Sequence, residues 1–125
     1  MLQRITLHLA RNQEFPEGSP ECGYEIIAPL DEAGRLDAEA WKKVRDRCRV
    51  RRFWAGDEDQ MGQLVHDAGG AGGATWKIDY DPGAFGEDEA GYRLDSHRFV
   101  ADEYVSIRDA QGHSHTFKIA EIRPV

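Results

Sequence analysis

Residues 103–124 read EYVSIRDAQGHSHTFKIAEIRP and predict a β-hairpin near the end of the chain. Apolar residues alternate with polar ones on both sides of Gly112, at Val105, Ile107, Phe117 and Ile119. Alternation with a period of two is typical of a strand that is buried on one face. The segment therefore predicts two antiparallel strands joined by a short turn.

The turn residues predict the register of this hairpin. A three-residue loop at residues 110–112 places a glycine at the left-handed position that such loops require. A two-residue loop would instead require positive φ at alanine or glutamine, which disfavour it. The longer loop pairs Val105 with Phe117 and Ile107 with His115, so the apolar side chains share one face.

Further strands are predicted along the rest of the chain, at residues 4–10, 22–28, 49–55, 61–66, 74–80 and 92–99. The first of them places His8 on its polar face. One helix is expected from an N-cap at Asp37 to about Arg47, with Trp41 as the side chain that packs on the sheet. Residues 81–91 read as an acidic, glycine-spaced loop.

These segments predict a mainly β (α+β) fold, a small curled antiparallel sheet or barrel of about seven to eight strands with one helix packed on it. The length of 125 residues indicates a single domain, 1–125. Ile122 is out of phase with Ile119, so we expect a bulge or bend at Ala120 and Glu121.

Composition favours a cytoplasmic bacterial protein. Apolar runs are too short for a spanning helix, and the first residues begin a strand pattern with no signal-peptide core. Arginine outnumbers lysine twelve to four, a usage typical of GC-rich bacterial genomes. Cys22 and Cys48 have no metal or redox spacing, which predicts two buried thiols in a reducing compartment.

A basic segment from Lys42 to Arg52 carries seven lysines and arginines against one aspartate, so its net charge is +6 while the rest of the chain carries −13. One hypothesis is a nucleic-acid contact through Arg49, Arg51, Arg52 and Trp54, where arginines bind phosphates and the indole stacks on bases. The other is that these arginines pair with carboxylates of the same chain or of a second copy in a homodimer. The net charge of −7 argues against nucleic-acid binding by the whole surface.

A second candidate site is the pair His113 and His115, two imidazoles on one face of the same strand. A third ligand is expected from Asp95, His97 or Asp109. Imidazole with carboxylate is a ligand set for zinc, iron or another transition metal. The alternative is that both histidines pair with neighbouring side chains, among them Asp109.

Four blocks of the sequence carry a resemblance to a family of small uncharacterised bacterial domains: residues 23–24, 28–31, 76–81 and 103–107. The resemblance covers most of the chain, and its motifs are structural in character. It implies a bacterial, cytoplasmic protein and no particular activity.

The function expected from the sequence is a non-enzymatic binding or interaction module that uses the mouth of a barrel or an exposed strand edge. No nucleophile with a neighbouring base is visible in the sequence, and no catalytic residue, cofactor or membrane contact is predicted. A metal site at His113 and His115 and a nucleic-acid surface at residues 42–52 are the two alternatives.

Overall fold

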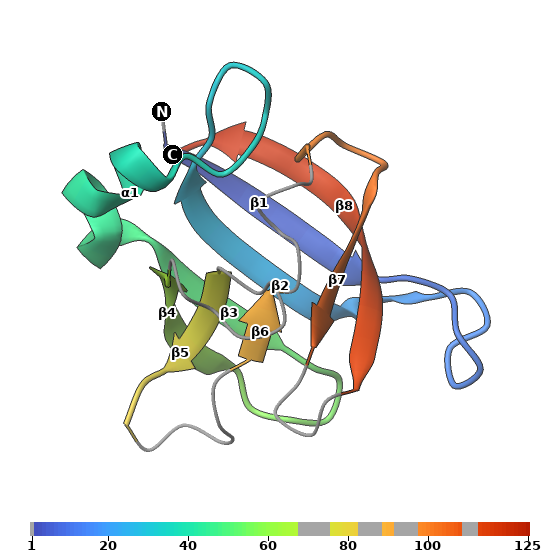
Figure 1. Cartoon of the computed structure of the whole chain (residues 1–125). Coiled ribbons are helices and arrows are strands. Elements are labelled where there is room, and N and C mark those ends of the chain that lie inside the picture. Colours follow the sequence, from blue (N-terminus) through green and yellow to red (C-terminus); the bar gives the residue numbers. More distant parts are fainter. Residues whose placement is uncertain (1, 68–75, 83–88, 92–97, 109–112) are drawn as a thin grey trace.

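A computed structural model describes residues 2–67, 76–82, 89–91, 98–108 and 113–125. The chain is mainly β, with one short helix (Figure 1). The strands are β1 (Leu2–Leu9), β2 (Ser19–Pro29), β3 (Arg49–Phe53), β4 (Gln60–His66), β5 (Trp76–Tyr80), β6 (Glu89–Gly91), β7 (Tyr104–Arg108) and β8 (Ser114–Pro124). Between β2 and β3 lie the helix α1 (Ala38–Val44) and a 3₁₀ turn, η1 (Arg45–Arg47).

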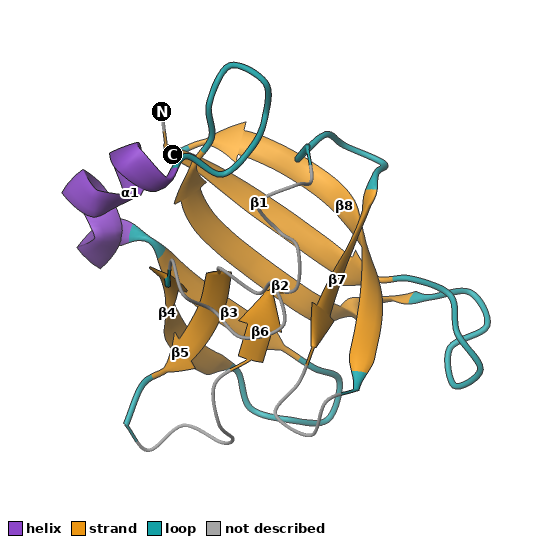
Figure 2. Ribbon diagram, viewed as in Figure 1, coloured by secondary structure: helices purple, strands orange, loops and turns teal. Residues whose placement is uncertain are grey.

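The strands form a closed antiparallel barrel in which each pairs with its neighbours in the chain and β8 returns to pair with β1 (Figure 2). The predicted mainly β fold with one packed helix is therefore confirmed. The ladders are long between β1, β2 and β8, whereas β6 pairs with β7 only through Ala90 and Arg108. Pairing of β8 with β1 covers the edges of these two strands, whereas β7 pairs with β6 at one position among the described residues.

The hairpin register predicted from the sequence is confirmed. Val105 pairs with Phe117 and Ile107 pairs with His115, and three of these side chains are fully buried. The predicted turn at residues 110–112 lies outside the described residues. This register places the apolar side chains of both strands on one buried face, as the alternation predicted.

The bulge expected in the last strand is also confirmed. Leu7 pairs with Ile119, but Ile5 pairs with Ile122, so β8 contains one more residue than β1 between the two pairs. The register shift lies at Ala120 and Glu121, where the sequence predicted it. The extra residue returns Ile122 to the side of the sheet that faces the core.

Side chains fill the interior of the barrel. The fully buried ones come from both halves of the sheet: Ile5, Leu7, Val50, Leu64, Trp76, Ile78, Val105, Ile107, Phe117 and Ile119. Eight strands enclose just enough space for such side chains to fill. A ligand therefore has to bind at an end of the barrel or on its outer surface.

The helix packs against the barrel through Trp41. Its indole Nε1–H donates a hydrogen bond to the Leu64 carbonyl at 3.0 Å, and its ring meets Trp76 edge to face at 6.0 Å. The N-cap is Asp37, as predicted, and its carboxylate accepts from the Ala40 N–H at 3.1 Å. The α-helix itself ends at Val44, and the remainder of the predicted helix is the 3₁₀ turn η1.

One part of the predicted strand pattern is wrong. The loop expected at residues 81–91 ends in β6, which pairs with β5, while Arg98 and Phe99 are not in a strand. Phe99 is buried, and its N–H donates to the Gly34 carbonyl at 2.7 Å, so this backbone is satisfied by a turn and not by a ladder. Residues 92–97, the rest of the predicted strand, lie outside the described residues.

Cys22 and Cys48 are buried free thiols, as the sequence predicted. Among the described residues, no helix is long and apolar enough to cross a membrane.

Candidate functional site

The two ends of the barrel differ. The helix α1 connects β2 to β3 at one end, while the loops that follow β1 and β3 lie at the other end (Figure 1). At this second end lies a cavity of about 370 Å³, lined by residues 9–15, Trp54 and residues 114–116. We call it the mouth cavity. Ligand pockets in proteins typically have volumes of about 300–1,000 Å³.

Strand alternation brings Trp54 and His115 to this cavity. Val50 is buried in β3, so side chains two and four residues further along face the same way. In β8, Phe117 is fully buried, and His115 precedes it by two residues. The Trp54 and His115 rings meet edge to face with their centroids 6.2 Å apart.

The aromatic core of the barrel continues into the mouth cavity. Trp54 also contacts the Phe117 ring at 6.5 Å, and Phe117 contacts Tyr24 at 5.1 Å, each edge to face. Such pairs stabilise by about 0.5–1.5 kcal/mol beyond the area that they bury. The packed rings therefore hold Trp54 in a defined orientation at the cavity wall.

The β1–β2 loop forms the opposite wall and is held by its own hydrogen bonds. The Phe15 N–H donates to the Asn12 Oδ1 at 2.8 Å, and the Asn12 N–H donates to the Phe15 carbonyl at 3.0 Å. The Gly18 N–H donates to the same carbonyl at 2.9 Å. In the sequence, Pro16, Gly18 and Pro20 predict a loop at residues 11–21 but indicate no site.

The candidate metal site is only partly within the described residues. His113 is exposed just before β8, and His115 is half-buried within it, in the order that the hairpin predicts. Asp95, His97 and Asp109 lie outside the described residues. Within the part of the chain that the structure describes, no three His, Cys, Asp or Glu side chains gather as metal ligands, and His115 contacts an indole ring.

Two of the candidate nucleic-acid residues are ion-paired with carboxylates of the same chain. Arg49 binds Asp81 at 2.5 Å. Arg51 binds Asp59 at 3.0 Å and Glu25 at 3.4 Å. Partial burial of Arg51 disfavours its charge, but the hydrogen bonds to these carboxylates and their negative charges outweigh burial and raise the pKa of Arg51. The structure thus supports internal pairing for this part of the basic segment.

Of the other two candidates, Trp54 lines the mouth cavity and Arg52 contacts Trp54. The guanidinium of Arg52 lies over the Trp54 ring, 4.5 Å from the centroid, while that of Arg51 lies over the Phe53 ring at 4.7 Å. Alternation in β3 places Arg49, Arg51 and Phe53 outside the barrel and Arg52 with Trp54 on the side of the core. The residues of the predicted nucleic-acid surface therefore lie on two faces of the sheet. One of them, Trp54, contacts His115 of the other candidate site.

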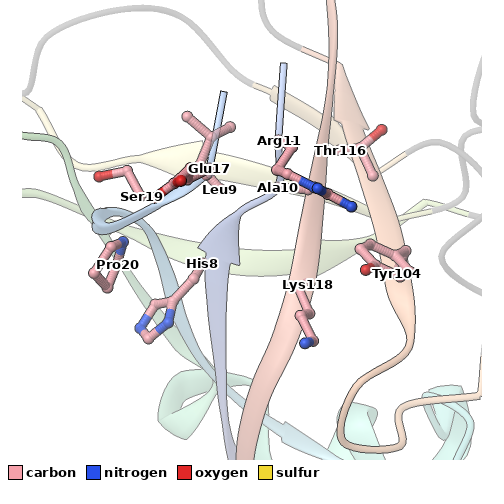
Figure 3. Close-up of a pocket in the computed structure, with 11 residues that line it drawn as sticks. His8, Leu9, Ala10, Arg11, Glu17, Ser19, Pro20, Tyr104, Thr116 and Lys118 are labelled. Carbon is pink, nitrogen blue, oxygen red and sulfur yellow. The ribbon is translucent and has the colours of Figure 1, made fainter. Parts of the chain in front are cut away.

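A second, larger cavity lies on the outer surface beside the same loop, with a volume of about 770 Å³ (Figure 3). Its lining residues are His8–Arg11, Glu17–Pro20, Tyr104, Thr116 and Lys118. We call it the outer groove. The sequence placed His8 on a polar strand face, but it gave no sign that β1 pairs with β8, which is what brings these residues together.

Comparison with protein-family models, with curated proteins and with solved structures finds no match for this chain. The resemblance to small bacterial domains stays a prediction.

Proposed function

We propose that the protein is a non-enzymatic binding module that takes a small, flat organic molecule in the mouth cavity. The observation that carries the proposal is the meeting of Trp54 and His115 at the wall of a pocket of ligand size. Ligand pockets combine apolar and aromatic walls with a few polar groups that orient the ligand. Here Trp54 and Phe15 supply the rings, while His115 and the side chains of Asn12 and Gln13 supply polar groups.

The fold supports the mouth over the other surface that the sequence offered. Among the described residues each strand from β1 to β8 pairs with a neighbour on both sides, so most strand edges are covered, although β7 pairs with β6 through Arg108 alone. The filled core blocks the interior. A ligand at the mouth would pack against the outermost rings of the core. These side chains are already ordered, so binding would cost little conformational entropy.

The test is a titration with indole, quinoline and adenine, followed in amide and indole N–H spectra. We expect at least one fragment to shift the Trp54 and His115 signals saturably at millimolar concentration. Replacing Trp54 by alanine should weaken this binding by about five- to 150-fold, since stacking on one ring contributes about 1–3 kcal/mol.

The neighbouring aromatic residue provides the matched control. Phe53 lies on the outside of β3 against His8, at a ring distance of 6.3 Å, so Phe53→Ala should leave fragment binding unchanged. If no fragment shifts the Trp54 signal, or if Phe53→Ala weakens binding as much as Trp54→Ala does, the mouth is not a ligand site.

Nucleic-acid contact, metal binding and homodimer formation stay hypotheses with their own tests. Contact of nucleic acid with Arg52 and Trp54 predicts a gel shift that weakens steeply between low and high salt. A transition metal at His113 and His115, and a homodimer joined through the basic segment, would both be detected by native mass spectrometry of untagged protein.

A further inference from the structure

We propose that the outer groove is a second binding site, which takes a small organic anion bearing a flat ring. The groove and the mouth cavity share part of their walls, since Arg11 and Thr116 line both. They differ in the residues that each has alone: Trp54, Phe15 and His115 line the mouth, whereas His8, Tyr104 and Lys118 line the outer groove.

Cross-strand register builds the floor of the groove. His8 on β1 pairs with Lys118 on β8, and Lys118 pairs with Tyr104 on β7. Residues paired across antiparallel strands project from the same face with Cβ atoms about 4.5–5.5 Å apart. The three side chains therefore form a row across three strands on the outside of the barrel (Figure 3).

A glycine extends this row and fixes the imidazole. Gly23 pairs with His8 on one side and with Phe53 on the other. Because Gly23 has no side chain, the Phe53 ring reaches His8 edge to face at 6.3 Å; a Cβ at Gly23 would lie 3.2 Å from Cζ of that ring. The His8 ring is thus packed on one side, and its other side lines the groove.

The loop forms the second wall and brings a further cation. Gly18 adopts a φ of +74°, and a Cβ there would lie 2.6 Å from the Leu9 carbonyl oxygen, so the loop closes tightly on the end of β1. This closure adds Arg11 and Glu17 to the lining of the groove. Loop and strands together enclose a space large enough for a ring with an anionic group.

The charges and donors select the class of ligand. Arg11 and Lys118 outnumber the one lining carboxylate, Glu17, although the whole chain has a net charge of −7. The Tyr104 hydroxyl adds a donor, while the Thr116 hydroxyl lies 3.4 Å from Ser106 Oγ. Charged and hydroxyl donors that converge on one space suit a carboxylate or a phosphate monoester.

Lys118 is available to a ligand at small cost. Its ammonium lies 3.4 Å from the Asp102 carboxylate, and that side chain is 83% exposed. Ion pairs at such exposure contribute little, so an anion in the groove can replace Asp102 as the partner of Lys118. Tyr104 is 54% exposed, which leaves a phenol ring at the groove for a flat ligand ring to pack against.

Calorimetric titration with phenyl phosphate, benzoate and benzyl alcohol tests the proposal and separates phosphate from carboxylate recognition. At least one of the two anions should bind saturably, and neutral benzyl alcohol should not. Replacing Lys118 by glutamine should weaken anion binding about tenfold, as expected for loss of one charge-assisted hydrogen bond. Arg11→Gln should weaken it in the same direction.

Two controls distinguish this site from general attraction of anions and from the mouth. Lys42→Gln makes the same charge change on α1, where the side chain is exposed and paired with Glu39, and should leave binding unchanged. Trp54→Ala should also leave it unchanged, so failure of the mouth proposal does not affect this one. Absence of saturable binding by either anion, or equal weakening by Lys42→Gln and Lys118→Gln, overturns the proposal.

Discussion

Adjacent residues of β3 have unrelated roles because strand geometry sends them to opposite faces. Arg51 lies outside the barrel between two carboxylates, whereas Arg52 lies over the indole of Trp54 beside the mouth cavity. In the sequence alone, Arg51 and Arg52 are equivalent members of one basic segment. The chemistry of this segment therefore depends on the direction of each side chain and not on its total charge.

Cys48 gives the stability of the protein a dependence on alkaline pH. Its side chain is fully buried, and Sγ lies 3.4 Å from the Val44 carbonyl. Burial, aided by the charge of Asp46, raises the pKa of the Cys48 thiol to about 11, although Arg47 opposes the shift. An exposed thiol ionises near pH 8.5, so the unfolded chain loses this proton before the folded chain does.

Stability should therefore be complete below about pH 8.5 and should fall as the pH rises toward 11. With about 1.4 kcal/mol for each pKa unit, the loss over this range is about 2–3 kcal/mol. Urea unfolding at pH 8 and pH 10.5 measures it, and Cys48→Ala should remove that part of the pH dependence while Cys22→Ala keeps it. Identical pH dependence in wild type and Cys48→Ala would contradict the assignment.

At the scale of the element, α1 is too short to be stable by itself and depends on its cap and on packing. Asp37 accepts a hydrogen bond from the Ala40 N–H, and Asp37→Ala should cost about 1 kcal/mol of stability. Asp37→Asn keeps an acceptor and should restore most of the loss. Denaturant unfolding of both variants gives the two numbers.

Glu39 is the matched control for the cap. Its side chain is 84% exposed and is paired with Lys42 at 3.2 Å, so Glu39→Ala should cost less than about 0.5 kcal/mol. The cap would have no special role if Asp37→Ala destabilised the protein no more than Glu39→Ala.

The elements also show which parts of the fold a sequence can predict. The hairpin of β7 and β8 was predictable because alternation and a glycine turn gave one register with a continuous buried face. β6 was not predictable, since residues 89–91 have no alternating pattern and form a strand by pairing with β5 and, at Ala90, with β7. Local pattern predicts a strand that buries its own side chains, but it misses one that depends on its neighbour.

The candidate sites depend on pairing between strands that are far apart in the sequence. The sequence identified Trp54 and His115 separately, each as part of a different site, and their contact requires β3 and β8 to share one barrel end. The outer groove requires the ladder between β1 and β8, which joins the two ends of the described chain. Neither the contact between Trp54 and His115 nor the ladder between β1 and β8 produces a pattern in the local sequence. Candidate residue types were therefore predictable, but which of them lie together was not.

At the scale of the whole molecule, closure of the barrel makes the two ends of the described chain neighbours (Figure 1). Gln3 pairs with Pro124, and the Val125 N–H donates to the Leu2 carbonyl at 3.3 Å. The strands therefore follow one another in a closed ring. The two termini could lie between any two neighbouring strands, provided that every ladder is kept.

This ring predicts that a circular permutant folds. Joining Leu2 to Val125 through a short glycine-serine linker and opening the chain between Asp57 and Glu58, two exposed loop residues, keeps all eight ladders. We expect one cooperative urea transition with an m-value within about 15% of the parent's, because the same surface is buried. A permutant opened instead between Ile5 and Thr6 interrupts β1 in both of its ladders and should not fold cooperatively. If both permutants fold equally well, or if neither does, the β1–β8 ladder does not close the barrel in the way described.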